Sequence, residues 1–320
     1  MESPQNIKKR LRSVNNINKI TKAMEMVAAT KMRKSQEIAL ASRPYAFAAL
    51  DFLATVSSLD SAKLPALFQK RAVKKVLFVL VSSDKGLAGA FNSSVFRKFE
   101  KHQKEFPTSA KGASVANEEH VYLAVGEKAF NYLSKKGYNV AKKFVAVGDY
   151  TTTEQVHPIT DFVVDGYMEG KWDRVIVVST HFRSALKQEP HVRRILPIDF
   201  DHIADTVKEI IPERGKFADL IKEHNINFVP NKENSKDYLI EPAPEEVLNK
   251  LARHLFFIQV YHLILEANAS EHSARRMAMK TASDNAKDLG GRLNLEYNKS
   301  RQSRITTEIA EISAGAEALS

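Results

Sequence analysis

The sequence predicts an α/β protein in which N- and C-terminal helices form a long antiparallel coiled coil beside a Rossmann-like central α/β domain with a mostly parallel sheet. Three observations predict this class. All 12 Gly lie after residue 85, and Pro is absent from residues 5–43 and 245–320. Apolar residues in these two end segments recur in steps of three and four. Because Gly and Pro break regular structure, the end segments are expected to be long helices and the middle a series of shorter elements.

The N-terminal segment predicts a helix from about residue 5 to residue 58. Ser3 and Pro4 suit the cap and the first turn of a helix. Pro44 is expected to kink or weaken it, because proline lacks a backbone donor. One narrow apolar stripe follows the segment through Ile7, Leu11, Val14, Ile17, Ile20, Met24 and Val27.

The C-terminal segment predicts a longer helix, from about residue 245 to residue 319. Its heptad stripe runs through Leu248, Leu251, Leu255, Ile258, His262, Leu265, Ala269, His272, Arg276 and Met279. The stripe turns apolar again at Ile305, Ile309, Ile312, Ala316 and Leu319. Gly290 and Gly291 should weaken the helix locally. Two long helices with narrow stripes pair most simply as an antiparallel coiled coil; separate helices on a globular core are the alternative.

The middle of the chain alternates predicted strands and helices. Strands are expected at 76–82, 120–125, 142–147, 173–179 and 192–198, and helices at 93–102, 127–135 and 153–168. Apolar strands that alternate with helices indicate a mostly parallel sheet covered on both faces. The predicted division is therefore a helix over 1–60, an α/β domain over 70–200, a connector over 201–242 and a helix over 243–320.

The formal charge of +10 is concentrated near the two ends of the chain. Residues 1–43 hold 10 Lys and Arg against three acidic residues, and residues 271–304 hold eight against four. A basic patch indicates nucleic acid, an anionic membrane or an acidic protein as partner. Nucleic acid is less favoured, because no aromatic side chains for base stacking occur between Ile7 and Arg43 or between His262 and Leu295.

No motif in the sequence matches a known catalytic, metal-binding or phosphate-binding site. The loop at residues 82–90 follows the first strand, where nucleotide-binding folds hold phosphate, but it matches no phosphate-loop motif. A tight turn, with Ser83 and Asp84 bonding the loop backbone, is the preferred interpretation; a nucleotide-binding enzyme using Gly86 and Gly89 is an alternative. With no Cys, no metal spacing among the His and no nucleophile motif, we expect no catalytic site, no metal and no cofactor.

Both ends of the chain resemble one known family. Residues 20–34 (ITKAMEMVAATKMRK) are similar to the N-terminal signature of the gamma subunit of F-type ATP synthase, bacterial type. Residues 270–280 (SEHSARRMAMK) and 295–319 (LEYNKSRQSRITTEIAEISAGAEAL) are similar to its C-terminal helix. The central domain resembles the family more loosely. The loop reads Gly86-Leu87-Ala88-Gly89-Ala90 where the family often has GLCGG.

The resemblance implies a central rotor shaft with no catalytic site of its own. Its partners would be three alpha and three beta subunits, the epsilon subunit and the membrane ring of c subunits. The location would be peripheral, on the cytoplasmic face of the bacterial inner membrane, with indirect membrane contact and no nucleic acid. The absence of Cys excludes the thiol switch of chloroplast members. The alternative function is a nucleic-acid-binding coiled coil with an α/β domain.

The resemblance also implies three sets of contact residues. Two side chains would face the acidic tip of the beta subunit: Met24 and Arg275. Four would engage a loop of one beta subunit: Arg301, Gln302, Thr306 and Glu308. Two would meet the membrane ring: Tyr238 and Glu241.

Overall fold

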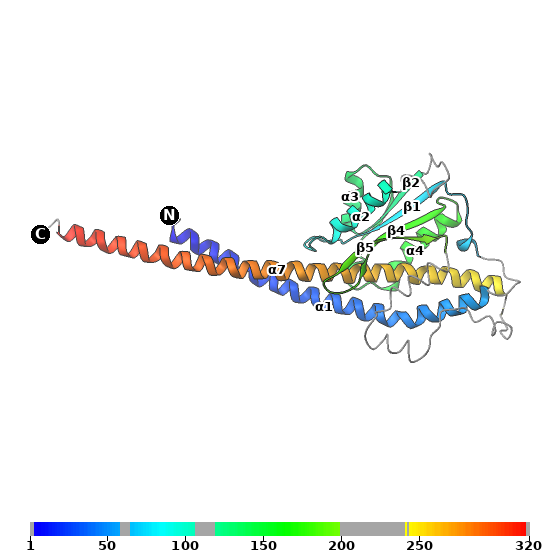
Figure 1. Cartoon of the computed structure of the whole chain (residues 1–320), viewed down its shortest axis with the longest axis horizontal. Coiled ribbons are helices and arrows are strands. Elements are labelled where there is room, and N and C mark those ends of the chain that lie inside the picture. The colour runs from blue at the N-terminus through cyan, green and yellow to red at the C-terminus, as the bar shows by residue number, and fades with distance from the viewer. Residues whose placement is uncertain (1–2, 58–64, 106–118, 199–240, 242, 318–320) are drawn as a thin grey trace.

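The structure is a computed structural model that describes residues 3–57, 65–105, 119–198, 241 and 243–317. It consists of a long helical pair with a sheet domain packed beside one half of it (Figure 1). The predicted connector at 201–242 lies outside the described residues except for Glu241. The predicted fold class, with terminal helices that pair and a central α/β domain, is confirmed.

The two long helices are α1 (Pro4–Ser57) and α7 (Pro244–Glu317). They lie antiparallel, and α7 extends past the start of α1 (Figure 1). Neither helix is interrupted at the expected weak points, since α1 continues through Pro44 and α7 through Gly290 and Gly291. Packing between the two helices therefore outweighs the local preference of these residues.

The seam of α1 differs from the predicted apolar stripe. The prediction is correct at Ile7, and wrong at Ile17, Ile20 and Val27, whose side chains are 51%, 59% and 55% exposed. The buried or half-buried positions instead follow a strict heptad: Ile7, Leu11, Val14, Asn18, Thr21, Glu25, Ala28, Met32 and Ser35. Five of these nine positions carry small or polar side chains, so the seam does not stand out by hydrophobicity. The predicted stripe of α7 is confirmed, with each position from Leu248 to Met279 buried or half-buried.

The sheet has five strands in the order β3-β2-β1-β4-β5. Their bounds are β1 (Lys75–Val81), β2 (Glu119–Val125), β3 (Val140–Phe144), β4 (Arg174–Phe182) and β5 (Gln188–Leu196). Strands β1 to β4 are parallel to one another, and β5 pairs antiparallel with β4. The order of the parallel strands is that of half a Rossmann fold.

Each face of the sheet has its own hydrophobic core. Helices α2 (Phe91–Glu105) and α3 (Glu127–Lys135) cover one face, where Phe78 and Phe99 pack edge to face. The other face is covered by α4 (Thr153–Met168), the short helix η1 (Ala66–Phe68) and α7. The sheet thus uses one of the two long helices as a covering layer, which fixes α7 to the domain.

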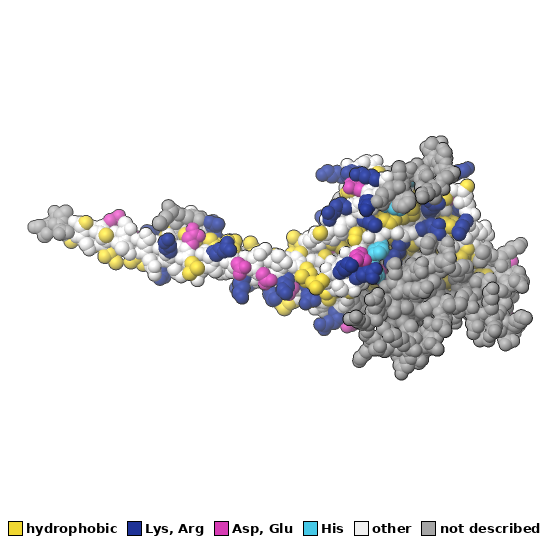
Figure 2. Space-filling model, viewed as in Figure 1, with side chains coloured by type: hydrophobic (Ala, Val, Ile, Leu, Met, Phe, Trp, Pro, Cys, Tyr) yellow, Lys and Arg dark blue, Asp and Glu magenta, His cyan; other side chains and the backbone are white. Residues whose placement is uncertain are grey.

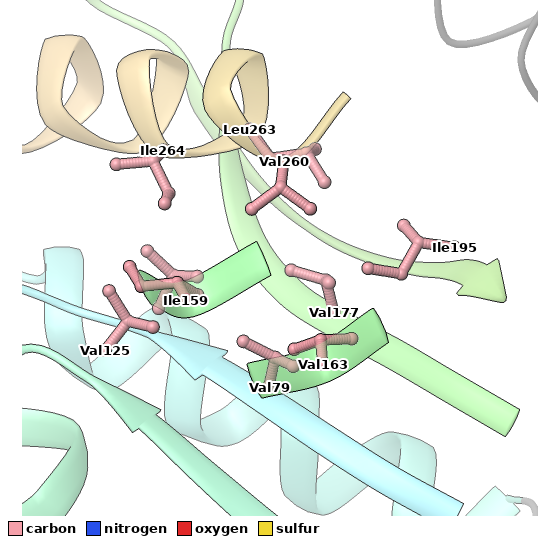
Figure 3. Close-up of a pocket in the computed structure, with 10 residues that line it drawn as sticks. Val79, Val125, Ile159, Val163, Val177, Ile195, Val260, Leu263 and Ile264 are labelled. Carbon is pink, nitrogen blue, oxygen red and sulfur yellow. The ribbon is translucent and has the colours of Figure 1, made fainter. Parts of the chain in front are cut away.

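The core between the sheet, α4 and α7 contains a small cavity (Figure 3). Its volume is about 10 Å³, and Figure 3 shows only apolar side chains pointing toward it, including Val79, Ile159 and Ile264. A space of this size approaches that of one water molecule, but a buried water needs polar partners. The cavity is therefore a packing gap and not a ligand site.

Candidate functional site at the neck and tip of the long helices

The neck is the stretch of α7 from residue 268 to residue 279, where the helix crosses the carboxyl ends of the parallel strands. Two loops meet it there: the β1–α2 loop (residues 82–90) and the β3–α4 loop (residues 145–152). Asn268 Nδ2 donates to the Val147 carbonyl at 2.9 Å and to Thr151 Oγ1 at 2.6 Å. His272 Nε2 lies 3.2 Å from the Gly148 carbonyl oxygen. The loops that bind ligands in related α/β folds here bind a helix of the same chain.

The Asp84 carboxylate lies at the start of α3, where it occupies one helix N-terminus that could otherwise hold an anion. Its Oδ1 accepts the backbone N–H of Glu127 at 3.0 Å, at the start of α3, and its Oδ2 accepts that of Ala146 at 2.9 Å. Ser83 Oγ donates to the Lys85 carbonyl at 2.7 Å. The preferred interpretation, a structured turn, is confirmed, although Asp84 bonds the backbone of two neighbouring segments and not that of its own loop.

Gly89 brings the β1–α2 loop against the long helix. It has a positive φ of 56°, and a Cβ added there would lie 3.7 Å from Ala278 Cβ. This left-handed backbone conformation favours glycine, so another residue at position 89 would strain the backbone. With Asp84 bound to the start of α3 and α7 packed against the loop at Gly89, the geometry does not favour the nucleotide-binding alternative.

Arg275 is held by groups of its own chain. Its Nη2 lies 2.6 Å from Glu271 Oε1 and 3.3 Å from the Gly86 carbonyl oxygen. Its Nη1 lies 3.3 Å from His272 Nδ1, which fits a neutral imidazole that accepts there and donates from Nε2 to Gly148. The predicted beta-facing residue is therefore half-buried and already paired.

Burial shifts the pKa of both neighbours of Arg275. Burial raises the pKa of the Glu271 carboxyl, and the Arg275 charge opposes this by lowering it. Burial, with the Arg275 charge as the second cause, lowers the pKa of His272 to about 4. His272 is thus neutral at pH 7, and the neck holds one buried ion pair beside a neutral imidazole.

Met24 lies at the same level of the helical pair as the neck. The hydrogen bond from Ser283 Oγ to Asn18 Oδ1, 2.6 Å long, sets the antiparallel register and places Met24 opposite residues 277–280. Its side chain is half-buried. The structure therefore places Met24 and Arg275 at one level of the shaft, and their shared contact with the beta subunit stays a prediction.

Two further residues lie beside the neck and are absent from the predicted site: Lys31 of α1 and Asp149 of the β3–α4 loop. Lys31 Nζ lies 2.8 Å from Asp149 Oδ1, so α1 is joined to the β3–α4 loop. The hydrogen bond from Lys31 is the main cause that lowers the pKa of Asp149. The position of Asp149, just after a parallel strand, is the sequence signal that could have identified it.

The tip is the part of α7 from residue 301 to residue 317, where four predicted contact residues lie. Arg301, Gln302, Thr306 and Glu308 are all exposed, and Arg301 is about 39 Å from Arg275 along the helix at ~1.5 Å per residue. Arg304 Nε pairs with Glu308 Oε1 at 2.7 Å, and Arg304 is absent from the predicted site although the four-residue spacing indicates the pair.

Apolar side chains are also exposed at the tip: Ile305 (47%), Ile309 (59%) and Ile312 (73%). Figure 2 shows such hydrophobic side chains along the projecting shaft.

Of the two predicted membrane-ring contacts, the structure describes Glu241, which lies at the other end of α7 from the tip. Tyr238 is outside the described residues, and Glu241 is exposed just before α7. Among the helices that the structure describes, none has the apolar stretch that a membrane crossing requires. The same residues contain no cluster of three or more potential metal ligands.

Comparisons with known proteins agree on one family. The family model described as ATP synthase matches residues 3–319. The chain is 35% identical to the ATP synthase gamma chain of Roseiflexus castenholzii over 321 residues, covering 100% of this chain and 99% of the relative. It is 35% identical to that of Polynucleobacter asymbioticus over 319 residues, with 100% of both covered.

Solved structures share the fold. A chain of the Euglena gracilis mitochondrial ATP synthase (OSCP/F1/c-ring, rotational state 3) has a TM-score of 0.63 at 18% identity, with 99% of this chain and 94% of that chain covered. A chain of the Tetrahymena thermophila enzyme (central stalk/c-ring) has a TM-score of 0.54 at 24% identity, with 82% and 99% covered. The full-length match at 35% identity, with paired terminal helices around an α/β domain, places this chain in the ATP synthase gamma-chain family.

Proposed function

We propose that the protein is the central-stalk rotor of an F-type ATP synthase and has no catalytic site of its own. One observation carries this proposal: a helix of 74 residues is anchored in a sheet domain at one end and leaves it at the other as an exposed shaft. A shaft of this kind can couple proton flow through a membrane ring to the conformational cycle of a catalytic hexamer. The family assignment leaves no support for the nucleic-acid alternative.

The proposed partners are three alpha and three beta subunits around the shaft, and the epsilon subunit and c ring at the sheet domain. The location is the cytoplasmic face of the bacterial inner membrane, peripheral and with indirect membrane contact. Relatives named as ATP synthase gamma chains support these assignments. The division at residues 1–60, 70–200, 201–242 and 243–320 is part of the same proposal.

The proposed contacts use the two zones of the shaft. At the tip, Arg301, Gln302, Thr306 and Glu308 meet a loop of one beta subunit, and their exposure supports this. At the neck, Met24 and Arg275 face the acidic beta tip. Because Arg275 already pairs with Glu271, meeting the beta tip requires it to share or exchange this partner. Tyr238 and Glu241 meet the membrane ring.

Reconstitution tests the function. The isolated chain should hydrolyse no ATP, and adding it to alpha and beta subunits of the same organism should raise their steady-state ATPase. The double variant Arg301→Ala/Gln302→Ala should reduce this stimulation, while Lys171→Ala, an exposed change on the sheet domain, should not. Normal ATP synthesis by complexes that lack the chain would contradict the proposal.

A further inference from the structure

We propose that torque passes between the sheet domain and the shaft through the β3–α4 loop, with the Lys31–Asp149 ion pair as the positioning contact that engages α1. The inference rests on the proposed rotor function and identifies where the two parts of the rotor are joined. Its evidence is a continuous set of contacts from the end of β1, through this loop, to both long helices.

The loop is first fixed to the sheet. The Asp84 side chain, which follows β1, accepts N–H groups from Ala146 in the β3–α4 loop and from Glu127 at the start of α3. Ala146 has a positive φ of 62°, a conformation that non-glycine residues adopt only when their surroundings impose it. Asp84 thus holds the first half of the loop in a defined position against the ends of β1 and β2.

The same loop then holds α7. Val147 and Thr151 accept the Asn268 amide, the Thr151 carbonyl also accepts Tyr261 Oη at 3.2 Å, and the Gly148 carbonyl faces His272. The Asn268 and His272 side chains are 6% and 1% exposed. Buried hydrogen bonds of this kind are costly to break, so they resist rotation of α7 about its axis.

Asp149, one residue farther along, reaches α1. Its Oδ1 lies 2.8 Å from Lys31 Nζ and 3.9 Å from His272 Nε2, so this carboxylate stands between the two helices. Helix α1 also packs along α7 through the seam that includes Thr21 and Ala28, and the ion pair adds a direct link from the sheet domain to α1. The Lys31–Asp149 pair makes both helices turn with the domain.

Charge exchange tests the proposal in the whole complex. Lys31→Glu, Asp149→Lys and the double exchange would be placed in the ATP synthase of the source organism, in inside-out membrane vesicles. ATP hydrolysis and ATP-driven proton pumping would be measured on the same vesicles. The matched control is Lys75→Glu, since Lys75 pairs with Glu119 at the same 2.8 Å but at the opposite end of the sheet. This chain has no Cys of its own, so in the double variant Lys31→Cys/Asp149→Cys the two introduced thiols are the only ones that it offers to a bis-maleimide.

Each single exchange should lower the ratio of pumping to hydrolysis by about threefold, and the double exchange should restore it, because opposite charges face each other again. The cross-linked complex should keep wild-type coupling, since both linked parts belong to one rigid rotor. The control should not change the ratio. Thermal midpoints of the single exchanges within about 2 °C of the control would show that the fold is intact.

Three results would overturn the inference: single exchanges that keep wild-type coupling, a double exchange that does not restore it, or a cross-link that stops pumping. Failure of the proposed function looks different. In that case the wild-type chain itself would restore neither hydrolysis nor pumping to depleted vesicles, and both proposals would be wrong.

Discussion

His272 makes the stability of the neck dependent on pH. Its pKa of about 4 lies below the ordinary value of 6.5, so the unfolded chain takes up a proton first as the pH falls. The stability contributed by the neutral imidazole is therefore present above pH 6.5 and is lost as the pH falls toward 4. The loss can reach about 3 kcal/mol at ~1.4 kcal/mol per pKa unit.

His272→Gln should remove this dependence, because a Gln amide can donate to the Gly148 carbonyl but does not titrate in this range. Urea unfolding of both proteins at several pH values between 4 and 7 measures the effect. The stability advantage of the wild-type protein over His272→Gln, measured as the difference in their unfolding free energies, should become smaller as the pH falls from 7 to 4. Glu271 acts in the opposite direction, since burial raises its pKa, but it is present in both proteins. Parallel pH curves would contradict the assignment.

Arg275 should matter for stability as well as for partner contact. Arg275→Ala leaves the Glu271 carboxylate buried without its partner, which should cost about 3 kcal/mol of unfolding free energy near neutral pH. Glu271→Gln in the same chain should recover part of this loss, because the unpaired charge is gone. Chemical unfolding of the two single variants and the double variant gives the coupling energy, and strictly additive losses would argue against the pair.

At the scale of the element, two adjacent glycines of α7 have opposite surroundings. A Cβ on Gly290 would lie 3.3 Å from Asn15 Oδ1 of α1, whereas a Cβ on Gly291 meets nothing within 4 Å. Gly290→Leu should therefore force the helices apart and cost about 2 kcal/mol. Gly291→Leu should stabilise the chain by up to about 1 kcal/mol, because Gly is a poor helix former. Thermal unfolding followed by circular dichroism distinguishes them, and equal midpoints would contradict the close approach at Gly290.

The seam of α1 shows where the sequence could not be interpreted from hydrophobicity alone. Ile17, Ile20 and Val27 are apolar and helically spaced, yet they are exposed, while Asn18, Thr21 and Ala28 face α7. Polar and small residues share the seam with Ile7, Leu11, Val14 and Met32, so hydrophobicity alone does not mark it. The strict seven-residue spacing from Ile7 to Ser35 was the better signal, because it follows the geometry of the pair and not the polarity of its residues.

At the scale of the whole molecule, the fold class could be predicted from the sequence, but the long-range contacts that join the sheet domain to the helices could not. Strand and helix patterns indicated the sheet and the terminal helices, since each pattern depends on residues close in sequence. The contacts of Asp84 with Ala146 and of Lys31 with Asp149 join residues 62 and 118 positions apart. Their partners are set by how the domain lies on the helices, which no local pattern contains.

Assembly of the whole rotor with its partners should depend on salt. The neck and the rest of the shaft carry the excess positive charge of the chain, and charge attraction mainly accelerates association. Raising ionic strength from about 20 mM to 200 mM should slow binding of the chain to the alpha and beta subunits, with little change in dissociation. Stopped-flow fluorescence measures both rates, and a salt-independent association rate would exclude an acidic partner surface.

The tip has a further mechanical consequence. From the sheet domain to about residue 301, the shaft consists of α7 paired with α1. From residue 301 to Glu317, α7 continues alone for about 25 Å at ~1.5 Å per residue. A single helix bends far more easily than a packed pair. Sideways displacements of the tip would therefore be taken up mainly by bending of the single helix, so that the paired part of the shaft and its joint with the sheet domain would move little.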